Sequence, residues 1–238
     1  MAFEQSDQDV VVGTHAPARS EAQVAGFLRS VYGWMCLGLA ITAGTALWVS
    51  NTPGLVQSIA SNRLLFWGIL IAQFGVVIYL SARVQRLAPA TAGLLFTGYS
   101  ALTGVFLSLL LLIYTAQSIA STFLVSASMF GALALYGTVT RRDLSGLGQF
   151  AMMGLFGVLI ASVVGIFWQN SMFQFVLSVC GVVVFTGLTA WDAQRLRALA
   201  LALPEGRTGS YAIVGALKLY LDFINLFLFL LNLFGRRR

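Results

Sequence analysis

The sequence predicts an all-α membrane protein with seven transmembrane helices, and three observations carry this prediction. Of its 238 residues, 58% are hydrophobic and only 9% are charged, a balance outside the range of soluble globular domains. The apolar residues gather in runs of roughly 20, the length that a helix needs to cross a bilayer core of about 30 Å. The charged residues fall mainly between these runs.

Seven apolar runs are long enough to span a bilayer. They cover approximately residues 28–50, 64–82, 88–114, 118–139, 147–168, 172–194 and 211–234. The links between them are short, which favours antiparallel packing of consecutive helices. The sixth helix should continue beyond the bilayer, because "RLRALALAL" (195–203) consists of strong helix formers. The predicted organisation is a polar cytoplasmic tail (1–26), a seven-helix domain (27–235) and a basic carboxyl terminus (236–238).

The distribution of basic residues predicts the orientation in the membrane, because Lys and Arg are enriched in cytoplasmic loops. Nine arginines fall on the amino-terminal side: Arg19, Arg29, Arg83, Arg86, Arg141, Arg142, Arg195, Arg197 and Arg207. Four fall on the other side: Arg63, Arg236, Arg237 and Arg238. We therefore predict a cytoplasmic amino terminus. The terminal "GRRR" would then be external, so a re-entrant last segment that returns the carboxyl terminus to the cytoplasm is the alternative.

Composition also excludes several classes of function. The net charge of +6 comes from basic residues spaced singly or in pairs between apolar runs, a pattern typical of loops at a lipid surface rather than of nucleic-acid binding. Cys36 and Cys180 lie inside apolar runs and His15 in the polar tail, so these residues form no ligand-spacing pattern for a metal. We expect no cofactor and no nucleic-acid partner; the lipid bilayer is the expected surrounding.

Two acids lie within or at the margin of a predicted span. Asp192 stands in "GLTAWDAQRLRAL" and Asp222 in "LYLDFINLFLFLLNLFG". A carboxylate at bilayer depth costs roughly 2.5–3.5 kcal/mol or more unless it faces protein or water and finds a partner. Arg207 is the centre of the turn between the two helices, with Asp192 fifteen residues before it (207 − 192) and Asp222 fifteen after it (222 − 207). Because the two helices are antiparallel, these equal offsets predict that Asp192 and Asp222 lie at the same depth in the membrane.

Paired carboxyl groups at hydrogen-bonding range would share a proton through a coupled titration. Such a pair is a pH-dependent latch that requires no histidine. The alternative is two ordinary ion pairs on helix surfaces, with Arg195 three residues after Asp192 and Lys218 four residues before Asp222.

Several stretches resemble the Bax inhibitor-1 family of membrane proteins, in its bacterial form. The closing "LYLDFINLFLFLLNLFG" (219–235) is similar to the family's final helix, and "FTGLTAWDAQ" (185–194) to its sixth. The fourth-to-fifth passage "YGTVTRRDLSGLGQFAMMGLFGVLIASVVGIF" (136–167) and the third-span "LTGVFLSLL" (102–110) also resemble it. The resemblance covers roughly residues 25–235. Trp191 and Ala193 depart from the Tyr and Thr that usually flank the sixth-helix acid.

The resemblance implies a seven-helix fold whose last helix is central and wrapped by the other six. It also implies a pH-sensitive passive calcium leak in a bacterial inner membrane, gated by Asp192 and Asp222. Calcium would be the transported ion, held weakly and transiently by these two acids. A basic residue at the end of the second helix would pair with the acids in the closed state, and Arg83 or, alternatively, Arg86 in "YLSARVQRL" matches it.

Two other classes of function stay open at this point. The first is a membrane-embedded regulator that binds a membrane protease or a cell-death factor, with the acids serving only the fold. The second is an intramembrane aspartyl protease, since that chemistry also needs paired aspartates on neighbouring helices. Such proteases carry Gly-x-Gly-Asp at the second acid, whereas Asp222 follows Leu-Tyr-Leu. We therefore expect no enzymatic activity.

Overall fold

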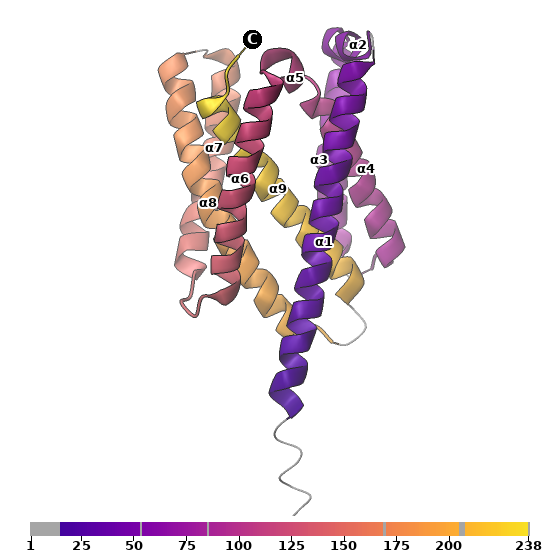
Figure 1. The fold of residues 1–238 in the computed structure, drawn as a ribbon, viewed down its shortest axis with the longest axis vertical. Coiled ribbons are helices and arrows are strands. Elements are labelled where there is room, and N and C mark those ends of the chain that lie inside the picture. The colour runs from indigo at the N-terminus through magenta and orange to yellow at the C-terminus, as the bar shows by residue number, and fades with distance from the viewer. Residues whose placement is uncertain (1–14, 53, 85, 169, 205–207, 238) are drawn as a thin grey trace, which may run out of the picture.

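The fold is a bundle of helices (Figure 1). The computed structural model describes residues 15–52, 54–84, 86–168, 170–204 and 208–237. The helices in these ranges are α1 (His15–Asn51), α2 (Leu55–Ser61), α3 (Arg63–Arg83), α4 (Pro89–Leu107), α5 (Leu110–Ile113), α6 (Ala116–Val139), α7 (Ser145–Phe167), α8 (Ser171–Ala202) and α9 (Thr208–Phe234). Seven of them are long and apolar enough to cross a membrane. The prediction of an all-α membrane protein is therefore confirmed.

The boundaries differ from the predicted spans in three places. Helix α1 already includes residues 15–26, which belong to the predicted polar tail; residues 1–14 of that tail lie outside the described part. The predicted third span divides into α4 and the single-turn α5, and at the break the Ser108 hydroxyl donates to the carbonyl of Val105 (2.6 Å). The short helix α2 follows Gly54, whose φ of 76° lies in the region that glycine tolerates best.

Side-chain caps begin three of the spans. The Asn62 side chain accepts hydrogen bonds from the amides of Leu64 and Leu65 at the start of α3, and Asn170 and Thr115 cap α8 and α6 in the same way. Capping satisfies amides that have no partner inside the helix. Short links that carry few charges can therefore reverse the chain at the membrane surface.

Helix α9 is the most buried span. In its most apolar window 67% of the residues are buried, against 44% or less in every other candidate span. It crosses the bundle obliquely (Figure 1) and contacts α1, α3, α4, α6 and α8, while α7 packs against α8. Most side chains of α9 therefore face protein rather than lipid.

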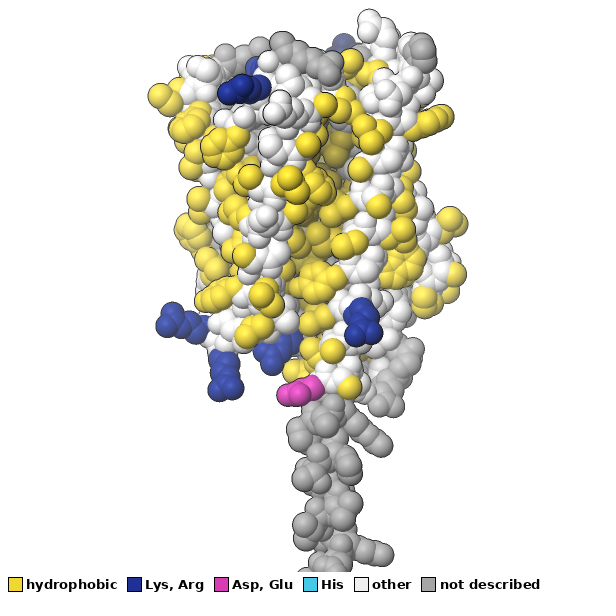
Figure 2. Space-filling view, viewed as in Figure 1, with side chains coloured by type: hydrophobic (Ala, Val, Ile, Leu, Met, Phe, Trp, Pro, Cys, Tyr) yellow, Lys and Arg dark blue, Asp and Glu magenta, His cyan; other side chains and the backbone are white. Residues whose placement is uncertain are grey.

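The two ends of the described chain lie at opposite ends of the bundle (Figure 1). We call the end that holds the start of α1 the amino-terminal end. Helix α9 is one unbroken helix that leads away from it, so the described residues contain no re-entrant turn. At the far end, Arg236 is tied to the start of α6, because its amide donates to the Ser118 hydroxyl (3.0 Å). Figure 2 shows hydrophobic side chains over the middle of the molecule and basic side chains toward its ends.

Candidate functional site

The hairpin of α8 and α9 brings the two predicted acids together. Asp192 and Asp222 are each only 6% exposed. Their carboxyl groups lie against each other, close enough for a hydrogen bond between the two side chains. The equal offsets from Arg207, which itself lies outside the described residues, thus correspond to a direct meeting of the two side chains.

A single lysine balances the charge of the pair. The ammonium Nζ of Lys218, which lies one turn before Asp222 on α9, is 3.0 Å from Oδ1 of Asp192 on α8. It makes the one ion pair found among the described residues. The Lys218 side chain is 44% exposed and that of Asp192 only 8%, so the lysine reaches inward from the molecular surface. The alternative arrangement, in which each acid pairs with a base on its own helix, is not the one observed.

One carboxylate oxygen of Asp222 has no hydrogen-bond partner. Its Oδ2 is buried, and no described residue donates to it. A buried acceptor left without a donor costs about 1–3 kcal/mol, and more when it is charged. A proton on Asp222, or a positively charged ligand beside it, would therefore remove the energetic cost of leaving this oxygen without a partner.

Trp191 gives the pair an aromatic neighbour. Lys218 Nζ lies 5.8 Å and Arg195 Cζ 5.3 Å from the centroid of the Trp191 ring, both in cation–π range. Gly148 of α7 makes room for this ring, because a Cβ at that position would overlap it. Sequence reasoning missed the role of Trp191 and considered Lys218 only as a partner of Asp222, not of Asp192. The available signal was that Lys218, the one lysine of the chain, lies one turn before an acid in a predicted span.

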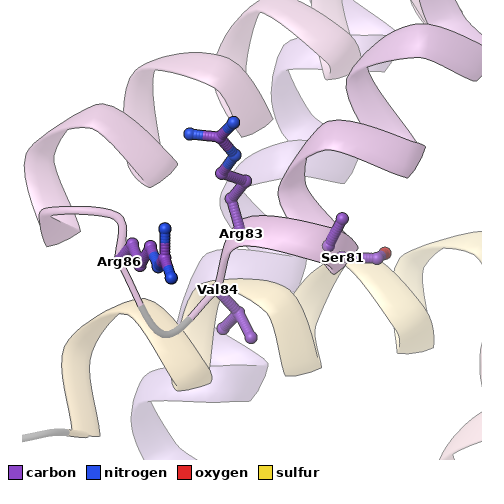
Figure 3. A pocket seen from close by; sticks show the side chains of 5 residues that line it. Ser81, Arg83, Val84 and Arg86 are labelled. Carbon is purple, nitrogen blue, oxygen red and sulfur yellow. The ribbon is translucent and has the colours of Figure 1, made fainter.

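Arg83 and Arg86 lie elsewhere in this structure. Arg83 is the last residue of α3 and Arg86 lies in the α3–α4 turn at the amino-terminal end; Figure 3 shows the Arg83 side chain pointing away from the α9 ribbon beneath the turn. The Arg83 guanidinium lies over the ring of Tyr79, 5.9 Å from its centroid. The cation beside the acids is Lys218 instead. A contact of Arg83 with the acids in a closed state stays a prediction.

Asp192 and Asp222 alone form a small set of possible metal ligands. Within the described part of the chain, no group of three or more His, Cys, Asp or Glu side chains could hold a metal. Calcium takes 6–8 oxygen ligands, so two carboxyl groups would supply only part of its shell. Water and carbonyl oxygens would have to supply the rest.

Residues 24–238 match the family described as inhibitor of apoptosis-promoting Bax1. The chain belongs to this Bax inhibitor-1 family. The resemblance noted in the sequence is thereby confirmed, and the match includes the whole α8–α9 hairpin with both acids.

Similar bacterial proteins extend the comparison. The chain is 46% identical over 215 residues to an inner membrane protein of Escherichia coli, YbhL, with 89% of this chain and 92% of the relative covered. It is 44% identical over 216 residues to an uncharacterised protein of Deinococcus radiodurans (90% and 92% covered). It is 32% identical over 221 residues to an uncharacterised membrane protein of Streptococcus pyogenes (92% and 96% covered). The chain is thus similar to these bacterial proteins over nearly their full length.

Proposed function

We propose that this protein is a passive cation leak, carrying calcium across a bacterial inner membrane, and that the proton shared by Asp192 and Asp222 gates it. The observation that carries the proposal is the buried carboxyl pair, in which Lys218 neutralises Asp192 while Oδ2 of Asp222 has no donor. Two buried acids beside one lysine balance in charge only when one of the acids holds a proton.

The proton provides the gate. With one proton shared, the two carboxyl groups attract each other and hold α8 against α9. Without it, two like charges lie side by side at low dielectric, where they repel strongly. The contact between the helices then weakens, and the site gains a net negative charge that attracts a cation. Because α9 packs against five other spans, a shift at Asp222 is transmitted to most of the bundle.

The same chemistry suits calcium as cargo. Conduction needs a site that binds an ion well enough to admit it and weakly enough to release it. An incomplete shell of two carboxyl groups meets both needs, since water supplies the remaining ligands. No resident cofactor is part of the proposal.

The experiment is calcium entry into liposomes loaded with a calcium-sensitive dye. We expect liposomes that contain the purified protein to fill faster than empty ones, and the Asp192→Asn/Asp222→Asn double variant to lose most of this flux. The matched control is Asp143→Asn, which removes an acid from the α6–α7 link but leaves the pair intact. Equal entry into empty and protein-containing liposomes would contradict the leak and favour the regulatory hypothesis.

A further inference from the structure

A groove runs along the membrane-facing side of the bundle between α1 and α6. Its floor is α9, and Figure 2 shows hydrophobic side chains filling the hollow between the two walls. The part toward the amino-terminal end and the part beyond it are adjacent, because Leu39, Phe123 and Phe223 line both. The proposed gate does not use this groove.

The groove is open to lipid and nearly devoid of polar groups. Its walls carry side chains such as Leu47 and Leu124, which are 54% and 67% exposed. The hydroxyl of Thr42 in the lining is already bonded to the carbonyl of Ser100 (2.9 Å) and the Tyr220 hydroxyl (2.6 Å). An occupant of this surface therefore meets mainly hydrocarbon, apart from Cys36 and the hydroxyls of Tyr32 and Thr138.

Its length suits a fatty acyl chain. On α1 the lining extends from Tyr32 to Leu47, which corresponds to about 22 Å at a rise of 1.5 Å per residue. One leaflet of hydrocarbon is about 15 Å thick, half of a bilayer core. A lipid tail that enters at one end of the groove fits within it.

The amino-terminal end of the groove is basic. The Arg197 guanidinium donates to the carbonyl of Thr138 (3.0 Å), and the Thr138 hydroxyl faces that of Tyr32 across the groove (3.5 Å). Arg29 lies one turn before Tyr32 on α1 and is exposed, as Arg197 is. Neither arginine makes an ion pair with any described residue. Two cations without carboxylate partners among the described residues thus lie near the end of the groove that Tyr32 and Thr138 line.

We propose that this groove binds an anionic phospholipid. One acyl chain lies between α1 and α6 against Phe123, which lines both parts of the groove and is 39% exposed, and the phosphate lies between Arg29 and Arg197. Charge complementarity decides between lipids, because a zwitterionic headgroup gains less from two arginines than an anionic one. The site is linked to the acid-bearing helix through Phe123, because this ring packs against Phe223, the residue after Asp222 in α9.

The native cysteines report on occupancy. Cys36 lines the groove, whereas Cys180 is exposed on α8 outside it. We would delipidate the full chain in detergent, add phosphatidylglycerol or phosphatidylcholine, and follow N-ethylmaleimide labelling of each cysteine by peptide mass. Phosphatidylglycerol should slow labelling of Cys36 about tenfold and leave Cys180 unchanged, and phosphatidylcholine should protect Cys36 only at much higher concentration.

Two matched pairs of variants assign the contacts. Gly131→Leu fills the groove at a position where a Cβ meets open space, and Gly157→Leu makes the same change on α7, also in open space. Arg29→Gln/Arg197→Gln removes the two positive charges at the end of the groove. Arg83→Gln/Arg86→Gln removes two positive charges from the same end of the bundle but away from the groove. We expect the first member of each pair to weaken phosphatidylglycerol binding about tenfold in native mass spectrometry. The second member should bind like the parent.

Equal protection of Cys36 by both lipids would overturn the anionic assignment. If Arg29→Gln/Arg197→Gln and Arg83→Gln/Arg86→Gln lose phosphatidylglycerol binding to the same extent, the binding depends only on general surface charge. That result would also reject the site. If no lipid slows labelling of Cys36, the groove is not a lipid site, and a transmembrane helix of a protein partner becomes the occupant to test.

Discussion

At the scale of single residues, the charge balance of the site depends on Lys218. It is the only cation within ion-pair distance of the buried acids among the described residues, and it bonds to Asp192 rather than to Asp222. Removing one partner of a buried ion pair is costly, because the other charge stays buried without compensation. Lys218 itself is partly exposed, so the effect should be smaller than for a fully buried pair.

Replacing Lys218 with Met should therefore lower the free energy of unfolding, by about 2 kcal/mol. Arg195→Met is the control, because Arg195 shares the ring of Trp191 but makes no ion pair with the acids. Thermal unfolding in detergent near neutral pH measures both. In an Asp192→Asn background the same Lys218→Met change should cost little, since residues of one network are not additive. Equal losses in both backgrounds would show that the ion pair contributes nothing.

Part of this site was predictable and part was not. The depth of Asp192 and Asp222 follows from counting residues on either side of one turn, because an antiparallel hairpin has a fixed rise per residue. The partner of Lys218 does not follow, because it depends on how the two helices are rotated about their axes. Four residues of spacing equally allow a bond within α9, and only packing directs the side chain across to Asp192.

At the scale of helices, Gly137 sets the distance between α6 and α8. A Cβ at this position would overlap the backbone carbonyl of Ala190, and backbone cannot move aside as a flexible side chain can. Small residues at such crossings let helices approach closely in a membrane. The approach matters for the site, because Ala190 lies two residues before Asp192.

Gly137→Ala should consequently destabilise the protein by about 1–3 kcal/mol through overpacking. Gly131→Ala on the same helix is the matched control, since a Cβ there meets nothing within 4 Å. It should leave stability unchanged or raise it slightly, because alanine favours a helix more than glycine does. Comparing the thermal unfolding midpoints of both variants with the parent tests this; a loss in Gly131→Ala as large as in Gly137→Ala would contradict it.

Asp143 provides a second test at the scale of helices, at the start of α7. The amide and hydroxyl of Ser145 donate to its carboxylate (2.9 and 2.6 Å), and these bonds hold the pKa of Asp143 below its ordinary value. A lowered pKa in the folded state means stabilisation that is present above the ordinary pKa and lost as pH falls through the lowered one. The difference in stability between parent and Asp143→Asn should therefore be constant from about pH 8 to about pH 5 and shrink only in stronger acid.

Unfolding of both proteins across this range checks the prediction. A difference that already changes between neutral pH and about pH 5 would contradict it. Because the difference in stability between the parent and Asp143→Asn should not change in this range, Asp143→Asn is a suitable control for a pH response of the buried pair.

The long helices were predictable for a simple reason. A span must be about 20 apolar residues long whatever it packs against, so composition alone indicates it. The short helices α2 and α5 have no such requirement. Their positions depend on local turns at Gly54 and Ser108, and no periodic pattern in the sequence indicates them.

At the scale of the whole molecule, charge is distributed unequally between the two ends. Among the described residues whose side chains lie toward the ends, the amino-terminal end holds Arg29, Arg83, Arg86, Arg141, Arg142, Arg195, Arg197 and Lys218. The opposite end holds Arg63, Arg236 and Arg237. This asymmetry predicts that the amino-terminal end faces the cytoplasm.

Topology reporters test the orientation. A fluorescent protein that matures only in the cytoplasm should be dark when fused after Arg238, and alkaline phosphatase, active only outside, should work there. The same reporters fused at the α3–α4 turn should give the reverse pattern. A bright fluorescent fusion after Arg238 would contradict the orientation.

The proton gate is the central claim, and the pH profile of calcium entry into proteoliposomes tests it most directly. Parent, Asp222→Asn and Asp143→Asn would be compared from about pH 5 to about pH 8. We expect the parent and Asp143→Asn to change their calcium flux together across this range. Asp222→Asn should show one flat rate close to the parent's rate at low pH, because an amide mimics only the protonated acid. An Asp222→Asn profile that follows the parent's at every pH would contradict the shared-proton gate and leave the buried acids a structural role.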